Sequence, residues 1–254
     1  MNRLFSALAL TLPEMAILVG SGGKTSLMFT LAAEASRQGI RVLTTTTTKI
    51  FPPTPVQSPR LVLAAETADL EAELRRAFEE SPLVTAADGL NQEGKLTGLP
   101  PEIVDRLFIN KVADLIIVEA DGAKHRPLKA PGPHEPVIPS FAGLVVPVIG
   151  LGGLGKKLDD ETVFRAGIFA RLSGLARGEP VTAETVARVV FHPEGLCRDA
   201  PRRARLIPFL NQADLLEAEA AKTAAAVVYG EAKGRADRVV WGSLLPEPDL
   251  NVWP

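Results

Sequence analysis

Short apolar runs alternate with segments of helical spacing along almost the whole chain. The apolar runs predict strands at residues 14–19, 40–45, 60–64, 82–86, 114–119, 144–149, 205–210 and 237–241. Apolar positions three and four apart predict helices at residues 24–38, 67–79, 101–108, 160–175, 182–190 and 213–228. Such alternation is typical of an α/β fold with three layers, in which helices cover both faces of a mostly parallel sheet.

The 254 residues are enough for one large core, and we expect a single α/β domain over residues 1–254. A helical lobe is expected at about 156–200, inserted before the last two strands. The apolar residues Leu4, Phe5, Leu8 and Leu12 predict a packing helix, because no small-residue cleavage site typical of a signal peptide follows them.

Composition narrows the classes of partner. The net charge of −2 gives no electrostatic case for nucleic-acid binding, and no apolar run approaches membrane-spanning length. Cys197 is the only cysteine, which excludes an intramolecular disulfide and fits a reducing compartment, so we expect a cytoplasmic protein. A buried structural thiol is the favoured role for Cys197, and a metal or substrate ligand is the alternative.

The first candidate site is the glycine-rich turn after the first predicted strand. Its residues are Gly20, Ser21, Gly22, Gly23, Lys24, Thr25 and Ser26. Glycines let backbone N–H groups face a phosphate, and the helix behind them presents its positive end. Lys24 would reach the β- and γ-phosphates, and the Thr25 hydroxyl would hold Mg²⁺. Leu18 stands where a full Walker A pattern has its first glycine, which leaves the shorter Gly-x-x-Gly-Lys-Thr loop of the Mur ligases.

Two carboxylates at the end of the apolar run 114–119 form the second candidate. Glu119 and Asp121 stand two residues apart at the carboxyl end of a predicted central strand. In P-loop proteins this position faces the magnesium ion of the nucleotide, and Mg²⁺ needs only one or two carboxylates beside phosphate and water. We expect one of the two to hold the metal and the other to orient an attacking water.

The run Thr44–Lys49 is the third candidate. Five consecutive threonines are too polar for one buried strand, so the later ones should leave the sheet. We expect this strand to lie beside the first one, which would bring its hydroxyls to the γ-phosphate or to a water on Mg²⁺. The alternative is that the threonines are present only because they favour a β-strand.

A basic segment follows the two carboxylates. Lys124, Arg126 and Lys129 are expected to bind an anionic second substrate, because prolines stiffen the segment and it lies at the ligand edge of the sheet. His125 is a candidate for proton transfer, although it has no visible partner. Arg165, on a later predicted helix, is a further residue that could face the ligand.

Asn211-Gln212-Ala213-Asp214 resembles the guanine-recognition signature of GTPases, with glutamine in place of lysine. Asn211 is expected to tie the loop and to accept or donate a hydrogen bond at the base. The Asp214 carboxylate could accept hydrogen bonds from N1–H and the N2 amino group of guanine, a pair that adenine does not offer. Ser243, at the end of a later strand, would close the base pocket. The alternative is that Asp214 caps a helix. The glycine-rich segment 150–155 is expected to be a substrate loop, because no helix begins directly behind it.

These segments together resemble one family, the selenium-dependent hydroxylase accessory proteins known as YqeC. The resemblance rests on Gly20–Thr25, Thr44–Lys49, Asn211–Asp214 and above all on the block Glu119–Lys124 with Arg126–Lys129. It implies a P-loop NTPase-like fold and a role beside selenium-dependent molybdenum hydroxylases. The partners that it implies are a molybdenum hydroxylase or a nucleotidyltransferase, and an anionic cofactor such as molybdopterin.

The sequence therefore predicts a magnesium-dependent nucleoside triphosphatase that uses GTP or ATP in the maturation of such a hydroxylase or its cofactor. Lys24, Glu119 and Asp121 are its expected catalytic groups. One alternative is a nucleotide-gated binding protein with negligible turnover, and another is an ATP-dependent activating enzyme like the Mur ligases.

Overall fold

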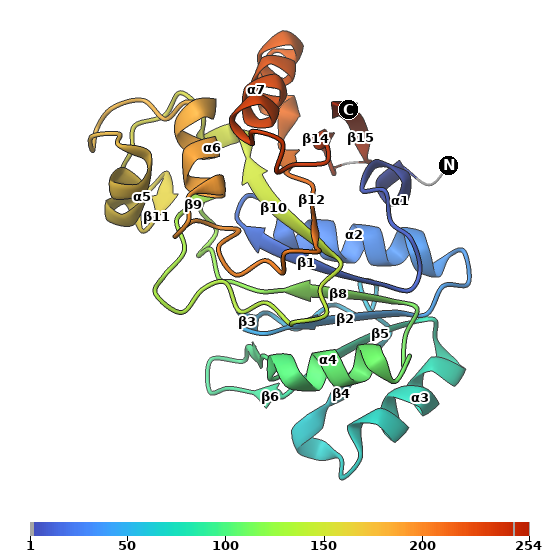
Figure 1. Cartoon of the computed structure of the whole chain (residues 1–254). Helices are drawn as coiled ribbons and strands as arrows, with labels where there is room; N and C mark the ends of the chain where they lie inside the picture. The colour runs from blue at the N-terminus through green and yellow to red at the C-terminus, as the bar shows by residue number, and fades with distance from the viewer. Residues whose placement is uncertain (1–2, 246, 254) are drawn as a thin grey trace.

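The central feature of the protein is a large, mostly parallel β-sheet, seen here in a computed structural model that describes residues 3–245 and 247–253. Its strand order is β15-β14-β13-β10-β1-β8-β2-β5-β4, with β12 paired to β10 (Figure 1). All pairs are parallel except β14 with β15. The strands are β1 (Glu14–Gly20), β2 (Val42–Thr46), β4 (Arg60–Leu63), β5 (Leu83–Ala87), β8 (Leu115–Glu119), β10 (Leu144–Gly150), β12 (Arg205–Leu206), β13 (Phe209–Asn211), β14 (Val239–Ser243) and β15 (Asp249–Trp253).

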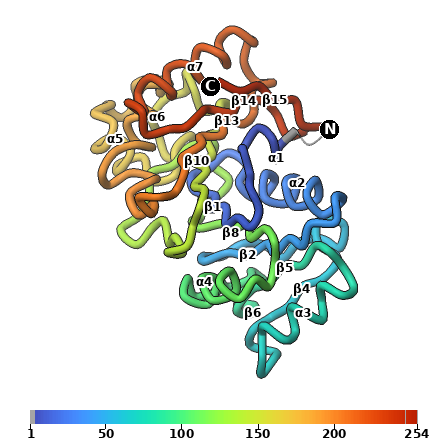
Figure 2. The backbone as a smooth tube through the Cα atoms, turned by 45° about the vertical axis from the view of Figure 1, so that its right-hand side comes forward, coloured from blue at the N-terminus to red at the C-terminus, as the bar shows by residue number. Residues whose placement is uncertain are grey.

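Helices cover both faces of this sheet, which confirms the predicted three-layer α/β class (Figure 2). Alternate residues of β1 show the two layers, since Ala16 and Leu18 join the core under α1 and α2, whereas Met15 and Ile17 join the opposite core. That opposite core holds α3 to α7. The helices are α1 (Arg3–Ala7), α2 (Lys24–Ser36), α3 (Leu70–Glu80), α4 (Pro101–Ile109), α5 (Ala166–Ser173), α6 (Ala183–Phe191) and α7 (Ala218–Glu231).

The order of the central strands differs from the sequence-based expectation in one respect. The strand that carries Thr44 was predicted to lie beside β1, but β8 lies between β1 and β2. All five residues of β8 are buried, and the strand pairs with a neighbour on each side. A strand buried on both faces is most stable in the middle of a sheet, which explains why β8 takes this position.

Several predicted elements are shorter or interrupted. The strand expected at 205–210 is divided at Pro208, because proline cannot donate a ladder hydrogen bond. The helix expected at 160–175 is restricted to α5, which the short strand β11 (Val163–Phe164) precedes. The helix expected from residue 213 begins only at Ala218, after a 3₁₀ turn at Ala213–Leu215. The antiparallel edge strand β15 was not predicted.

Smaller elements complete the edge at which the parallel strands end. A three-stranded sheet joins β3 (Lys49–Ile50), β6 (Gly89–Leu90) and β7 (Leu96–Thr97), and a second pair joins β9 (Leu128–Lys129) to β11. Helices α5 and α6, from the predicted lobe, pack on each other and on the α7 side of the main core. The packing helix predicted near the N-terminus is α1, whose Leu4 and Leu8 are buried. No helix in the described ranges combines the length and apolarity needed to cross a membrane.

Candidate functional site

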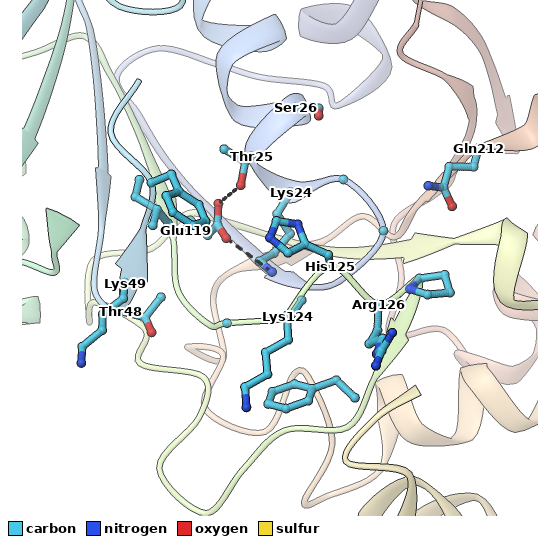
Figure 3. Close-up of a pocket in the computed structure, with 18 of the residues that line it drawn as sticks. Lys24, Thr25, Ser26, Thr48, Lys49, Glu119, Lys124, His125, Arg126 and Gln212 are labelled. Atoms are coloured by element: carbon cyan, nitrogen blue, oxygen red, sulfur yellow. Dashed lines mark hydrogen bonds and ion pairs between the residues drawn. The ribbon is translucent and has the colours of Figure 1, made fainter. Parts of the chain in front are cut away.

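A large cavity lies where the parallel strands end. Its volume is about 840 Å³, towards the upper end of the roughly 300–1,000 Å³ usual for small-molecule sites. Figure 3 shows Thr25, Lys24 and Glu119 at its centre, with Thr48 and Lys49 on one side and Gln212 on the other. The carboxyl edge of a parallel sheet is where open α/β folds bind ligands.

Positive charge dominates this cavity although the whole chain is slightly acidic. The cationic side chains that line it are Lys24, Lys49, Lys95, Lys124, Arg126, Lys156 and Arg165, and the carboxylates are Glu119 and Glu135. Concentrating cations in one hollow raises the local potential and favours an anionic ligand. The cavity is therefore suited to phosphate or carboxylate groups.

The glycine loop, defined as Gly20–Thr25, enters the cavity through its second half. Helix α2 begins at Lys24, and its N-cap Gly23 supplies no side chain to cap the first turn. The first N–H groups of a helix have no intrahelical partner, so those of Lys24, Thr25 and Ser26 remain available to an anion. Gly22, Gly23, Lys24, Thr25 and Ser26 all line the cavity, as the sequence predicted for a phosphate loop.

Gly20 and Ser21 have a different place from the other loop residues. The N–H of Gly20 donates to both oxygens of Asp121, at 3.1 and 2.9 Å, and the N–H of Ser21 donates to the Val148 carbonyl at 2.9 Å. The buried Ser21 hydroxyl has no hydrogen-bond partner among the described residues and borders a small hollow of about 10 Å³. These two residues anchor the loop and do not line the large cavity.

Asn211 ties the end of β13 to the glycine loop. Its Nδ2 donates to the Gly22 carbonyl at 2.8 Å, and a Cβ on Gly23 would collide with the same amide. The expected bond between Asn211 and the loop is thus present. Asn211 is buried and its carboxamide donates to the loop. Its role in a ligand site is therefore to position the glycine loop.

Gly22→Ala should lower the free energy of unfolding by about 3 kcal/mol, since it combines strained backbone with overpacking. Gly22 has φ of +89°, and a Cβ there would meet the backbone of Gly150 and, at 2.9 Å, the Pro127 carbonyl. Urea unfolding measures the change. Gly122→Ala is the matched control, because a Cβ on Gly122 meets nothing within 4 Å. Equal stability of the two variants would contradict the close approach at Gly22.

Lys24 is buried among oxygen atoms. Its Nζ lies 2.7 Å from the Gly20 carbonyl, 3.2 Å from Asp121 and 3.5 Å from Glu119. Burial alone would lower the pKa of Lys24, but the charges of Asp121 and Glu119 outweigh it and raise that pKa. The lysine is therefore held charged at the edge of the cavity.

Thr25 and Glu119 provide oxygen ligands of the kind that Mg²⁺ takes. The Thr25 hydroxyl donates to Glu119 Oε2 at 2.8 Å, and both side chains line the cavity next to the glycine loop (Figure 3). Burial raises the pKa of Glu119 more strongly than Lys24 and Thr25 lower it. No group of three or more His, Cys, Asp or Glu in the described residues could hold a metal, so an ion here would also need phosphate and water oxygens. That donor set fits Mg²⁺ and not a soft metal.

Asp121 lies behind the loop and outside the cavity. It is fully buried, accepts from the Gly20 N–H, and pairs with Lys24 at 3.2 Å and Lys129 at 2.8 Å. The sequence suggested that Asp121 holds the metal or orients water. In the structure its two carboxylate oxygens contact the Gly20 N–H and two lysines. This arrangement positions the glycine loop.

Lys129, expected to bind a second substrate, belongs to the same buried network. Its ammonium pairs with Asp121, and also contacts Glu135 and the Gly122 carbonyl, both at 2.7 Å. Burial of Glu135 opposes its ionisation, but hydrogen bonds from Arg165 and Lys129 and their charges outweigh it and lower its pKa to about 2. The network runs from Lys24 through Asp121, Lys129 and Glu135 to Arg165, which does line the cavity.

Lys124, His125 and Arg126 all line the cavity. Lys124 and His125 have φ of +46° and +60°, a conformation that side chains other than glycine adopt rarely and that clusters at functional sites. The Lys124 ammonium lies 5.3 Å from the centroid of the Phe164 ring. Two of the three cations predicted for the second ligand, Lys124 and Arg126, are thus in place, and Lys129 is not.

The threonine run leaves the sheet after its first residues, as expected. Thr44, Thr45 and Thr46 are buried in β2, and the chain then leaves the sheet. The Thr46 hydroxyl donates to the Glu119 carbonyl at 2.7 Å and the Thr47 hydroxyl to the Val137 carbonyl at 2.7 Å. Of the five, Thr48 lines the cavity.

The base-recognition candidates lie beside the cavity on its other side. The Ser243 hydroxyl donates to the Asp214 carboxylate and accepts from the Asp214 N–H at 3.0 Å. The wall itself comes from Gly152, Gln212 and Leu215, and the Gln212 Oε1 is buried without a partner in the described part of the chain. Gly152, from the glycine-rich segment 150–155, and Lys156, which follows it, line the cavity, whereas Asp214 itself is an exposed neighbour of the wall.

Sequence reasoning missed Phe51, Lys95, Glu135 and Phe164, which also line the cavity. These residues come from short strands and loops without periodicity. The one local sign of Phe51 was its place two residues after the candidate run Thr44–Lys49. Cys197 matches its predicted structural role, because it is buried and burial raises the pKa of its thiol to about 12.

Comparison with known proteins agrees with the resemblance in the sequence. The model of the YqeC protein family matches residues 16–167, a range that includes the glycine loop and both carboxylates. The chain is also 36% identical over 203 residues to an uncharacterized protein YqeC of Escherichia coli (strain K12), covering 79% of this chain and 76% of that protein. This chain belongs to the YqeC family.

Proposed function

We propose that the protein binds a magnesium nucleoside triphosphate, GTP or ATP, in the basic cavity and hydrolyses it. The observation that carries the proposal is the uncapped start of α2 beside Lys24, with the Thr25–Glu119 pair next to it. Free helical N–H groups, a charged lysine and a hard-oxygen pair at one point are what a triphosphate with Mg²⁺ requires.

In this proposal each loop residue has one task. The N–H groups from Gly22 to Ser26 and the ammonium of Lys24 bind the β- and γ-phosphates. Thr25 and Glu119 hold the ion, which when bound supplies charge neutralisation at the phosphate oxygens. Asp121 and Asn211 keep the loop in shape. Lys124 and Arg126 are left to contribute to the binding of an anionic second ligand.

A second candidate, a nucleotide-gated binding protein with slow turnover, has its own support. The carboxylates that line the cavity in the described residues are Glu119, bonded to Thr25, and Glu135, bonded to Lys129 and Arg165. Neither is free to orient an attacking water, which favours a low basal rate. A rate of nucleotide hydrolysis that rises steeply when a partner protein is added would identify a nucleotide-gated binding protein.

We propose that the nucleotide cycle serves the maturation of a selenium-dependent molybdenum hydroxylase or of its cofactor in the cytoplasm. A nucleotidyltransferase or the hydroxylase itself would be the partner, and molybdopterin, a planar anion, is an example of a ligand that the basic cavity could take.

Asp214→Ala should weaken GTP binding roughly 10- to 100-fold, because a hydrogen bond to a charged group is lost, and leave ATP binding unchanged. Calorimetric titration with Mg²⁺ and each nucleotide measures both affinities. Ser243→Ala is the control; it removes the hydroxyl that orients Asp214 but keeps the carboxylate, so a smaller loss for GTP is expected. Equal affinities for the two nucleotides, untouched by Asp214→Ala, would refute guanine recognition.

A further inference from the structure

The side of the cavity opposite Gln212 has a composition that nucleotide binding does not explain. We call it the lysine wall: Thr48, Lys49, Ile50, Phe51 and Lys95. It is built on the small sheet in which Lys49–Ile50 pairs antiparallel with Leu96–Thr97. Figure 3 shows Thr48 and Lys49 separated from Gln212 by the whole width of the glycine loop.

Phe51 presents an aromatic ring to this wall. The residue is 55% exposed, Lys95 Nζ lies 5.2 Å from its ring centroid, and the His125 ring stacks on it with centroids 6.3 Å apart and planes 23° from parallel. A ring exposed at the wall of a cavity is available to a ligand that enters it. Rings of this kind stack on planar ligands, and the neighbouring cations strengthen the contact.

The charges around Phe51 favour an anion. Lys49 and Lys95 line this part of the cavity, and Lys124 directly precedes His125, whose ring stacks on Phe51. Of the nearby carboxylates, Glu93 pairs with Lys95 at 3.0 Å, Glu119 is bonded to Thr25, and Glu135 is bonded to Lys129 and Arg165. The lysine wall contains no carboxylate, and the nearby carboxylates are already paired. The wall therefore keeps a net positive charge.

The backbone fixes where an occupant of this wall would lie. Thr46 pairs in register with Glu119, and the N–H of Thr47 donates to the Glu119 carbonyl at 3.2 Å. The wall begins with the next residue, Thr48. An occupant would thus lie beside the Thr25–Glu119 pair, on the side of the loop away from Gln212.

We propose that the lysine wall binds a second ligand that is a planar aromatic anion, its ring on Phe51 and His125 and its charge on Lys49 and Lys95. The proposal rests on the proposed function only in placing the nucleotide on the remaining part of the cavity. The ligand would then lie next to the terminal phosphate, where its binding can control hydrolysis.

The test uses 1-naphthyl phosphate as the probe, titrated calorimetrically into the full chain with and without a non-hydrolysable magnesium triphosphate. Cyclohexyl phosphate has the charge without the aromatic ring, and 1-naphthol has the ring without the charge. We expect 1-naphthyl phosphate to bind at least about tenfold more tightly than either, in both conditions, because stacking and charge contribute together.

Phe51→Leu keeps apolar volume but removes the ring, and should weaken binding of 1-naphthyl phosphate about fivefold or more while leaving cyclohexyl phosphate unchanged. Phe141→Leu is the matched control, since Phe141 is also exposed, has Arg203 5.1 Å from its ring centroid, and lies outside the cavity. Lys95→Gln should weaken the binding of both phosphates. Lys222→Gln should weaken neither, because the exposed side chain of Lys222 lies on α7, outside the cavity.

Displacement of the probe by the nucleotide would overturn the proposal, as would an unchanged probe affinity in Phe51→Leu. A loss of nucleotide affinity in Phe51→Leu would also overturn it, because the ring would then belong to the nucleobase. Failure of the proposed function gives a different pattern, in which the chain binds no nucleotide but still binds the probe through Phe51.

Discussion

Lys24→Ala is expected to lower nucleotide affinity roughly 10- to 100-fold and any turnover about 100-fold or more. The ammonium is the cation nearest to the loop amides, and its charge is retained because Asp121 and Glu119 raise its pKa. Without it, an incoming triphosphate would meet the Glu119 carboxylate with no lysine beside it. Calorimetry with Mg²⁺ and GTP or ATP, and phosphate release, measure the two losses.

Lys49→Ala is the control for this result, because Lys49 lines the same cavity but is not in the loop. It should change nucleotide affinity less than about threefold, as expected for a solvent-screened charge. Urea unfolding of both variants shows whether Lys24→Ala remains folded under the conditions of the titration. A folded Lys24→Ala protein with normal nucleotide affinity would refute the phosphate-loop function itself.

Asp121→Asn is expected to lower the free energy of unfolding by about 3–5 kcal/mol, because two buried lysines lose their shared carboxylate. Asp121 pairs with Lys24 and Lys129 and accepts the Gly20 N–H. Glu119→Gln should cost less stability, because burial already raises the pKa of Glu119, but should abolish the magnesium dependence of nucleotide binding. Urea unfolding and titrations at varied Mg²⁺ measure these effects.

Asp105→Asn is the matched control for Asp121. Asp105 is also a buried carboxylate that accepts two backbone N–H groups, from Ser140 and Phe141 at 2.9 Å each, and no ion pair to it occurs within the described ranges. Its substitution should cost only about 1–2 kcal/mol. If both variants lose the same stability, the lysines around Asp121 contribute nothing and its proposed positioning role is wrong.

Local patterns predicted most of the fold. The apolar runs located the main parallel strands because burial on both faces leaves an uninterrupted apolar signature, as in Leu115–Val118. The glycine loop and Glu119 could be proposed from the sequence because each belongs to a short contiguous motif, Gly20–Thr25 and the apolar run that ends at Glu119. The tie from Asn211 to the loop was predicted from a resemblance to another protein class.

What the sequence did not predict depends on contacts between distant segments. The position of β8 between β1 and β2 depends on which strands pair, and chain order does not specify this. Asp121 and Glu119 look alike in sequence, but only Asp121 has Lys129 behind it. Phe51 and Lys95 meet because of an antiparallel pairing between short strands.

The Asn211 hydrogen bond joins residues 189 positions apart, which has a consequence for how the chain matures. The loop sequence is complete early in synthesis, yet its shape depends on strand β10, on Asp121 and finally on the carboxamide at the end of β13. Gly20–Thr25 is therefore not a portable motif that would keep its geometry when grafted elsewhere. A growing chain acquires this loop geometry only when β13, in its last third, has docked, so nucleotide binding would report that β13 has joined the sheet.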